Sequence, residues 1–206
     1  MSGILSKLSA GAADGRGLAL CVLAMCAVVA ASNVAVQYPF TPFGLQDYLT
    51  WGAFTYPVAF LITDLTNRHF GARATRRVVF AGFVLAVILS IMLATPRIAF
   101  ASGTAFLTAQ LLDVTVFDRL RGGAWWRAPL ISSLIGSALD TVLFFTLAFA
   151  GSDLPEATYA LAGGITVPVW MGWAFCDWLV KLVCAGAMLV PFRAMMGRVT
   201  PLPAVS

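Results

Sequence analysis

Hydrophobic residues gather along the chain in six long segments, separated by short polar or basic stretches. The segments cover about 18–36, 49–66, 77–94, 98–117, 128–150 and 168–191. Each is close to the ~20 residues that an α-helix needs to cross a bilayer. None has the strict alternation of a barrel strand, and a helix satisfies its own backbone hydrogen bonds in lipid. The pattern predicts an all-α integral membrane protein, with six transmembrane helices in a single domain over residues 1–206.

Composition agrees with this pattern and excludes other classes of protein. Of the 206 residues, 60% are hydrophobic and only 11% are charged, whereas a soluble domain is about half apolar and a quarter charged. A soluble enzyme and a disordered chain are both excluded. The four cysteines lie inside apolar segments, far in sequence from His69, the only histidine. We therefore expect no zinc site, no disulfide framework and no cofactor.

The basic residues predict an orientation in the membrane. Lysine and arginine are enriched in the cytoplasmic loops of membrane proteins. Of the thirteen bases, Arg97 alone falls in a loop on one side of the predicted bundle, and Lys181 falls within the last segment. The other eleven share the opposite side, in the N-terminal stretch, two loops and the C-terminal tail. Both termini are therefore predicted to be cytoplasmic. Basic residues so placed indicate topology and contact with anionic lipid rather than nucleic-acid binding.

Two aspartates and a lysine are expected near the middle of the bilayer. Asp140 lies about 12 residues into the fifth segment and Asp177 about 9 residues into the sixth. Lys181 follows Asp177 by four residues, which places both on one helix face. An ionised side chain there costs about 2.5–3.5 kcal/mol and is a functional candidate by default. A structural pair of Asp177 with Lys181 is one reading; it leaves Asp140 for a ligand or a proton.

Further polar residues inside the segments extend the candidate site. Asp64 lies in the second segment, and Gln110 and Asp113 lie one turn apart in the fourth. Their alternative role is hydrogen bonding at helix ends or pairing with loop arginines. Asn33 and Gln37 are four apart on the first segment, where amides can join helices or recognise a ligand.

Backbone-shaping residues mark two further segments. Tyr56 precedes Pro57 in the second segment, where proline frees a carbonyl and bends the helix. The small residues around Ser133 and Ser137 favour close packing, either in the bundle or in a homodimer. No catalytic motif is present, so we expect a non-enzyme. An aspartyl protease built on Asp140 and Asp177 is the weaker alternative.

Four stretches resemble the queuosine precursor transporter family, also called the vitamin uptake transporter family. They are FTYPVAFLITDLTNRHFG (54–71), AQLLDVTVFDRLR (109–121), WWRAPLISSLIGSALDTVLFFT (125–146) and DWLVKLVCAGAMLVPFR (177–193). The resemblance implies a six-helix importer of the inner membrane that resembles the substrate-binding subunits of energy-coupling-factor vitamin transporters. It implies 7-cyano-7-deazaguanine and 7-aminomethyl-7-deazaguanine as substrates, for the queuosine modification of tRNA, with no dedicated ATPase.

A deazaguanine would suit these residues chemically. Its ring NH and 2-amino group can both donate to one carboxylate, and its flat ring needs an apolar or aromatic slot. We expect Asp140 or Asp113 to read that edge, and Asp177 with Lys181 to set the local field. The remaining alternatives are a binding subunit that needs an ATP-driven partner and an importer of another purine-like molecule.

Overall fold

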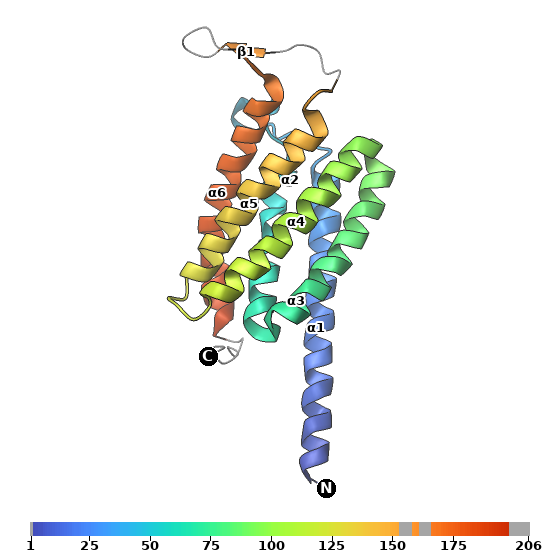
Figure 1. Cartoon of the computed structure of the whole chain (residues 1–206), viewed down its shortest axis with the longest axis vertical. Helices are drawn as coiled ribbons and strands as arrows, with labels where there is room; N and C mark the ends of the chain where they lie inside the picture. Colours follow the sequence, from blue (N-terminus) through green and yellow to red (C-terminus); the bar gives the residue numbers. More distant parts are fainter. Residues whose placement is uncertain (1, 153–157, 161–165, 198–206) are drawn as a thin grey trace.

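The computed structural model describes residues 2–152, 158–160 and 166–197, and it is a helical bundle (Figure 1). The long helices are α1 (Ser2–Ala35), α3 (Pro57–Leu93), α4 (Pro96–Leu120), α5 (Arg127–Phe149) and α6 (Val169–Met196). Short elements are η1 (Pro42–Gly44), α2 (Gly52–Thr55) and two antiparallel strands, β1 (Thr158–Ala160) and β2 (Thr166–Pro168). The all-α prediction therefore holds for the bundle but missed this hairpin between α5 and α6.

Five helices among the described residues are long and apolar enough to span a membrane. The prediction gave six because it separated 49–66 from 77–94 with a loop. In the structure that loop is helical except at Gly71, so residues 57–66 and 77–93 lie in two helical arms of α3 that meet at a kink. Gly71 has φ 77°, which a residue without a Cβ adopts readily. Figure 1 shows α3 changing direction at the lower end of the bundle.

Packing inside the bundle depends on small residues and interlocking side chains. α4 packs against α3 and α5, α1 packs against α3, and α6 packs against α5. The largest core cluster joins Met25 and Val29 of α1 to residues of α3 and to Phe106 of α4. A Cβ at Gly136 would lie 2.8 Å from the Phe60 ring. The small residues of α5 therefore serve packing within the bundle.

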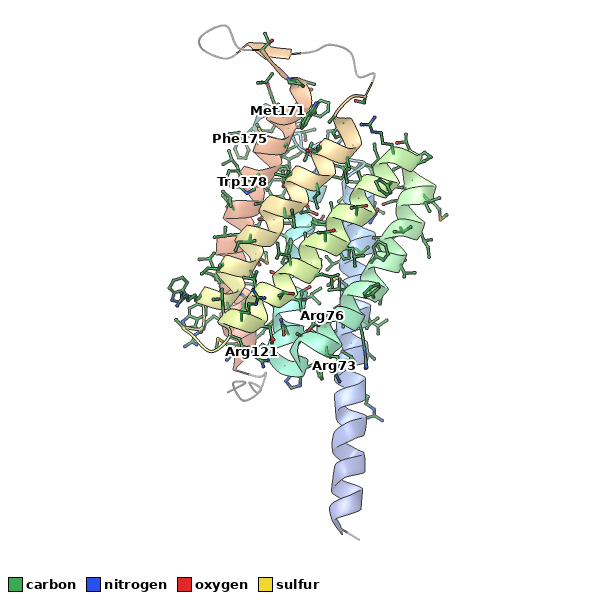
Figure 2. All side chains as sticks on the ribbon, in the orientation of Figure 1. Arg73, Arg76, Arg121, Met171, Phe175 and Trp178 are labelled. Carbon is green, nitrogen blue, oxygen red and sulfur yellow. The ribbon has the colours of Figure 1, made fainter. Side chains whose placement is uncertain are left out.

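The outer surface and the two ends of the bundle have different characters. Met171 and Phe175 on α6 are exposed apolar residues of the kind that face lipid tails. Arg73, Arg76 and Arg121 lie together near one end, which we call the basic end (Figure 2). α1 begins and α6 ends toward the basic end (Figure 1). We call the opposite end, where α5 ends and α6 begins, the pocket end.

Arg97 has a structural role at the pocket end. It is the second residue of α4, and its guanidinium donates to the carbonyl oxygens of Leu147, at 3.0 Å, and Ala150. Those carbonyls close the C-terminus of α5, where a cation is favoured by the helix dipole. The single base predicted on this side of the bundle therefore caps a neighbouring helix.

Candidate substrate-binding site

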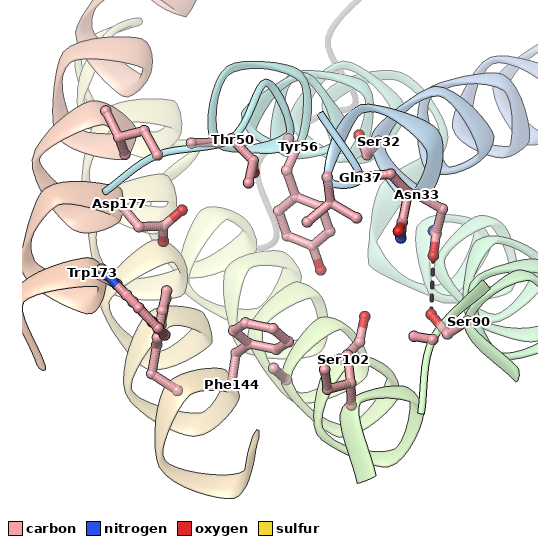
Figure 3. A pocket seen from close by; sticks show the side chains of 18 of the residues that line it. Ser32, Asn33, Gln37, Thr50, Tyr56, Ser90, Ser102, Phe144, Trp173 and Asp177 are labelled. Carbon is pink, nitrogen blue, oxygen red and sulfur yellow. Dashed lines mark hydrogen bonds between the residues drawn. The ribbon is translucent and has the colours of Figure 1, made fainter. Parts of the chain in front are cut away.

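A pocket of about 730 Å³ lies at the pocket end of the bundle (Figure 3). Its volume is within the ~300–1,000 Å³ range of small-molecule sites. Residues of every long helix and of the 46–50 loop line it. Six of the nine residues predicted for the site are among them: Asn33, Gln37, Tyr56, Asp140, Asp177 and Lys181. The tertiary fold thus gathers side chains from α1, α5, α6 and the start of α3 around one space.

Three of the four charged residues that line this pocket form a cluster that we call the lysine triad: Lys181, Asp140 and Asp177. Lys181 Nζ lies 2.8 Å from Asp140 Oδ2 and 2.6 Å from Asp177 Oδ2. The Thr141 hydroxyl donates to Asp177 at 3.0 Å and lies 3.1 Å from Lys181 Nζ. One reading of the sequence paired Asp177 with Lys181 and left Asp140 without a basic partner. In the structure α5 places Asp140 against the same ammonium, so Lys181 pairs with both aspartates.

The charge of the triad suits a ligand with hydrogen-bond donors. One ammonium between two carboxylates leaves one negative charge uncompensated if all three are ionised. Lys181 is 5% exposed and Asp140 4%, while the Asp177 side chain is 15% exposed. The ammonium also occupies the space between the two carboxylates, which argues against the proton-sharing dyad of an aspartyl protease. An incoming N–H donor could therefore meet a carboxylate that the protein has already oriented.

Tyr56 lines the pocket beside the triad. Its ring centroid lies 5.6 Å from Lys181 Nζ, a cation–π distance, and its edge packs on Phe106. Pro57 is the first residue of α3, and the short helix α2 ends just before Tyr56. Tyr56 itself keeps helical dihedral angles, with φ −60° and ψ −39°, so the helical path continues across the predicted break.

Aromatic side chains form another wall of the pocket. Trp173 packs edge to face on Phe149, with 5.6 Å between the ring centroids, and Phe144 also lines the space. In Figure 3, Asp177 and Trp173 lie on one side of the pocket, Asn33 and Gln37 lie on the other, and Tyr56 lies between them. Trp173 therefore presents an aromatic face to the pocket.

Two amides on the α1 side differ in their freedom. Asn33 is engaged twice, since it accepts from Ser90 at 2.9 Å and donates to the Val29 carbonyl at 3.0 Å. It therefore ties α1 to α3. Gln37 follows the end of α1, is exposed and lines the pocket. Of the two amides predicted for the site, Gln37 is the freer to meet a ligand.

The other three predicted residues, Asp64, Gln110 and Asp113, do not line this pocket. They form a separate buried cluster nearer the basic end. The Thr63 hydroxyl donates to Gln110 Oε1 at 2.5 Å, and Ser132 donates to Asp64 at 3.3 Å. Within the described residues, neither aspartate has the arginine partner that the sequence suggested. Asp113 is thus removed from the residues expected to read a ligand in the pocket.

Sequence reasoning missed several pocket residues. They share a hydroxyl or aromatic group within an otherwise apolar run, and examples are Ser90, Ser102 and Phe144. Thr141 contacts Asp177 and Lys181 from outside the pocket lining, and its only signal was its position directly after Asp140. A lone serine or phenylalanine in a membrane helix has no sequence feature that separates a pocket position from a packing position.

Known proteins resemble this chain over most of its length. The sequence model of a family described as "Putative vitamin uptake transporter" matches residues 50–95 and 89–196. The queuosine precursor transporter of Escherichia coli (strain K12) is 35% identical over 190 residues, covering 82% of this chain and 81% of the relative. The probable queuosine precursor transporter of Haemophilus influenzae is 35% identical over 195 residues, covering 80% and 79%.

The expected likeness to energy-coupling-factor subunits stays a prediction, because no solved structure matches the chain. Both relatives are named as transporters, which agrees with the expectation of a non-enzyme. The matched residues include the helices that carry the lysine triad, Tyr56 and the buried cluster. The resemblance seen in the four sequence stretches is thus confirmed, and the chain belongs to the vitamin uptake transporter family.

Proposed function

We propose that this chain imports queuosine precursors across the inner membrane as a secondary transporter. The names of its two relatives give the class of substrate, and 7-cyano-7-deazaguanine is the first candidate within it, ahead of 7-aminomethyl-7-deazaguanine. The observation that carries the proposal is the lysine triad, which opens onto an aromatic-walled pocket of about 730 Å³. A flat, donor-rich purine analogue fits that combination.

The polar and aromatic groups that line the pocket suggest how it would recognise a deazaguanine. Asp140 and Asp177 both contact Lys181 through Oδ2. We assign the ring NH and the 2-amino group of the deazaguanine to these two carboxylates, as charge-assisted hydrogen bonds, at Asp140 beside the Tyr56 hydroxyl that also interacts with it. Gln37 would donate to the carbonyl oxygen of the base, and Trp173 and Phe144 would cover its flat face. Lys181 holds both carboxylates in place and offsets part of their charge.

The topology that we propose has six crossings and cytoplasmic termini. α3 has 37 residues, or about 55 Å at 1.5 Å per residue, well beyond a bilayer core of about 30 Å. Its two arms on either side of Gly71 would therefore each cross once. The arginines of the basic end would then face the cytoplasm. The pocket would open toward the outer side, as an importer waiting for substrate requires.

Transport is tested by rescue and by reconstitution. A host unable to make or import queuosine precursors receives this chain and nanomolar 7-cyano-7-deazaguanine, and queuosine in its tRNA is measured. We expect restoration by the unmodified chain and loss in Asp140→Asn. The matched control is Asp118→Asn, which removes a carboxylate that pairs with Arg121 at 3.3 Å outside the pocket.

Reconstitution separates a secondary transporter from the binding subunit of an ATP-driven importer. Purified chain in liposomes, with no second protein and no ATP, should accumulate the labelled substrate. Binding without uptake would reject the secondary mechanism and favour the ATP-driven alternative. Absence of binding, from a chain that is folded and inserted, would reject the substrate.

A further inference from the structure

A second polar site lies deeper in the bundle, where Asp64 of α3 meets Asp113 of α4. We call these residues the carboxyl pair. They are 2% and 0% exposed, they lie on two helices that pack together, and each is an electrostatic neighbour of the other. The Ser132 and Ser133 hydroxyls of α5 donate to Asp64 at 3.3 and 3.5 Å. None of the ion pairs in the described residues includes either aspartate.

The environment of the carboxyl pair is incompletely satisfied. Both Asp113 oxygens are buried and receive no hydrogen bond from the described residues. Amides flank the pair, one turn from each aspartate: Gln110 on α4 and Asn67 on α3. Asn67 donates to the carbonyl of Val114, the residue after Asp113, so its amide lies in the same interface. Gln110 Nε2 and Asn67 Oδ1 are also buried without partners. These unpartnered groups indicate a missing ligand atom.

Charged groups on the surrounding helices do not neutralise the pair. The nearest in sequence position are Arg68 and His69 on α3, Asp118 and Arg119 on α4, Arg127 on α5, and Lys181 and Arg193 on α6. Lys181 is held in the lysine triad, Asp118 pairs with Arg121, and Arg68 has Arg193 as its charged neighbour. α1 has no charged residue between 17 and 35. None of these groups forms an ion pair with Asp64 or Asp113 among the described residues, so the carboxyl pair has no fixed counter-charge within 4 Å.

A proton suits this site better than a metal ion. Two neighbouring carboxylates in a buried site cannot both be ionised without a large electrostatic penalty. A carboxylic acid can donate to a neighbouring carboxylate, whereas two carboxylates are both acceptors only. No group of three or more metal-ligating side chains occurs among the described residues. A proton needs no coordination shell and no cavity, and one proton shared between the two carboxyl groups would remove the repulsion between them.

The carboxyl pair is connected to the pocket along α5. A void of about 10 Å³, near the smallest that holds one water, is bounded by Lys181 of the triad and by Ser133 and Ser137. Ser133, the partner of Asp64, precedes Asp140 by seven residues, or about 10 Å along the helix. The two serines and Asp140 therefore follow one face of α5. Lys181 of the triad and Ser133, which donates to Asp64, therefore line the same small void.

We infer that Asp64 and Asp113 share one exchangeable proton, and that this proton is carried inward with the substrate. A proton from the outer water converts one carboxylate of the pair to its acid while the pocket is open. Release of that proton to the cytoplasm restores the carboxylate and resets the site. The proton route follows the Ser137–Ser133 face of α5. The coupling rests on the proposed import function, whereas the proton site itself does not.

The proton site is tested without any substrate. The full chain in lipid nanodiscs is titrated with acid and base while infrared difference spectra record the carbonyl stretch of protonated carboxylic acid. We expect a band that is lost in Asp113→Asn and retained in the control Asp118→Asn. Ser133→Ala, a milder change that keeps both carboxyls, should move the pH midpoint of the band. Absence of the band from the unmodified chain, or its survival in Asp113→Asn, would overturn the proton site.

Coupling is tested in liposomes with labelled 7-cyano-7-deazaguanine. With one proton per substrate, an inward gradient of one pH unit sustains about 10-fold accumulation. Asp113→Asn should keep substrate affinity within about twofold and lose the accumulation. Uptake that ignores the proton gradient, or that needs sodium instead, would overturn coupling. If the unmodified chain binds no deazaguanine, the proposed substrate fails, while the infrared titration still decides whether the carboxyl pair holds a proton.

Discussion

The lysine triad and the carboxyl pair are two buried acidic sites that differ in how their charge is compensated. The triad has Lys181 within 2.8 Å of both of its carboxylates, and it lines an open pocket. The carboxyl pair has serine donors on Asp64 and no base among the described residues. A protein-supplied cation fixes the charge of the first site. The second site has no such fixed cation, and we infer that its charge changes by gain and loss of a proton.

This difference separates two tasks that a transporter must combine. A binding site needs a constant charge pattern, because its hydrogen-bond partners must be ready whenever substrate arrives. A coupling site needs two charge states of similar free energy, because it must load and unload in each cycle. In the mechanism that we propose, aspartate would serve both tasks, and the position of one lysine would distinguish them.

Removal of the lysine should have the largest effect. Lys181→Met leaves two uncompensated carboxylates in the bundle, and breaking a buried ion pair costs about 3–5 kcal/mol. We expect a strongly lowered unfolding temperature in lipid nanodiscs, loss of substrate binding and poor membrane expression. Arg121→Gln is the matched control, since it breaks the more exposed pair with Asp118 and should cost about 0–1 kcal/mol. Equal effects of the two changes would contradict a structural role for Lys181.

The two carboxylates of the triad should differ from each other. Asp140 is the more deeply buried, and a hydrogen bond to a charged group is worth about 1.5–3 kcal/mol. Asp140→Asn should therefore weaken substrate binding about 100-fold. Asp177→Asn, at the more exposed side chain, should weaken it about 10-fold. Isothermal titration with the purified chain measures the Kd of both variants. A larger loss in Asp177→Asn than in Asp140→Asn would place the deazaguanine nearer α6 than we propose.

The aromatic wall should contribute less than the triad. Stacking of a base on an aromatic side chain is worth about 1–3 kcal/mol in nucleic-acid complexes. Trp173→Ala should raise the Kd about 10-fold, and Trp173→Phe should recover most of that loss. Trp126→Ala is the control, because Trp126 is an exposed tryptophan outside the pocket. An unchanged Kd in Trp173→Ala would remove the stacking contact from the proposed site.

We expect the smallest effects from substitution of the two amides, Asn33 and Gln37, and we expect the two variants to differ. Asn33 is bonded to Ser90 and to the Val29 carbonyl, so Asn33→Ala should lower the free energy of unfolding by about 1 kcal/mol and leave the Kd nearly unchanged. Gln37 is exposed in the pocket, so Gln37→Ala should raise the Kd about threefold to tenfold without a loss of stability. Thermal unfolding and titration of both variants check this, and the opposite assignment would exchange their roles.

Local information was enough to predict several features. The hydropathy pattern located every long helix, because lipid imposes length and apolarity on each span. The four-residue spacing of Asp177 and Lys181 predicted their contact, since such residues share a helix face. The loop predicted after Asn67 was wrong, because polar and basic residues there remain helical and only Gly71 leaves the helical conformation.

The sequence by itself determined a helical membrane protein, its family resemblance and a set of costly polar residues inside the spans. It could not determine how those residues are grouped, because Asp140 and Asp113 look alike along the chain. Only the packing of α5 against α6 brought Asp140 to Lys181, and only the packing of α3 with α4 joined Asp64 to Asp113. The cost of a buried charge is local, whereas its compensation depends on which helix faces it. The tertiary structure therefore decided which aspartates belong to the pocket and which form the carboxyl pair.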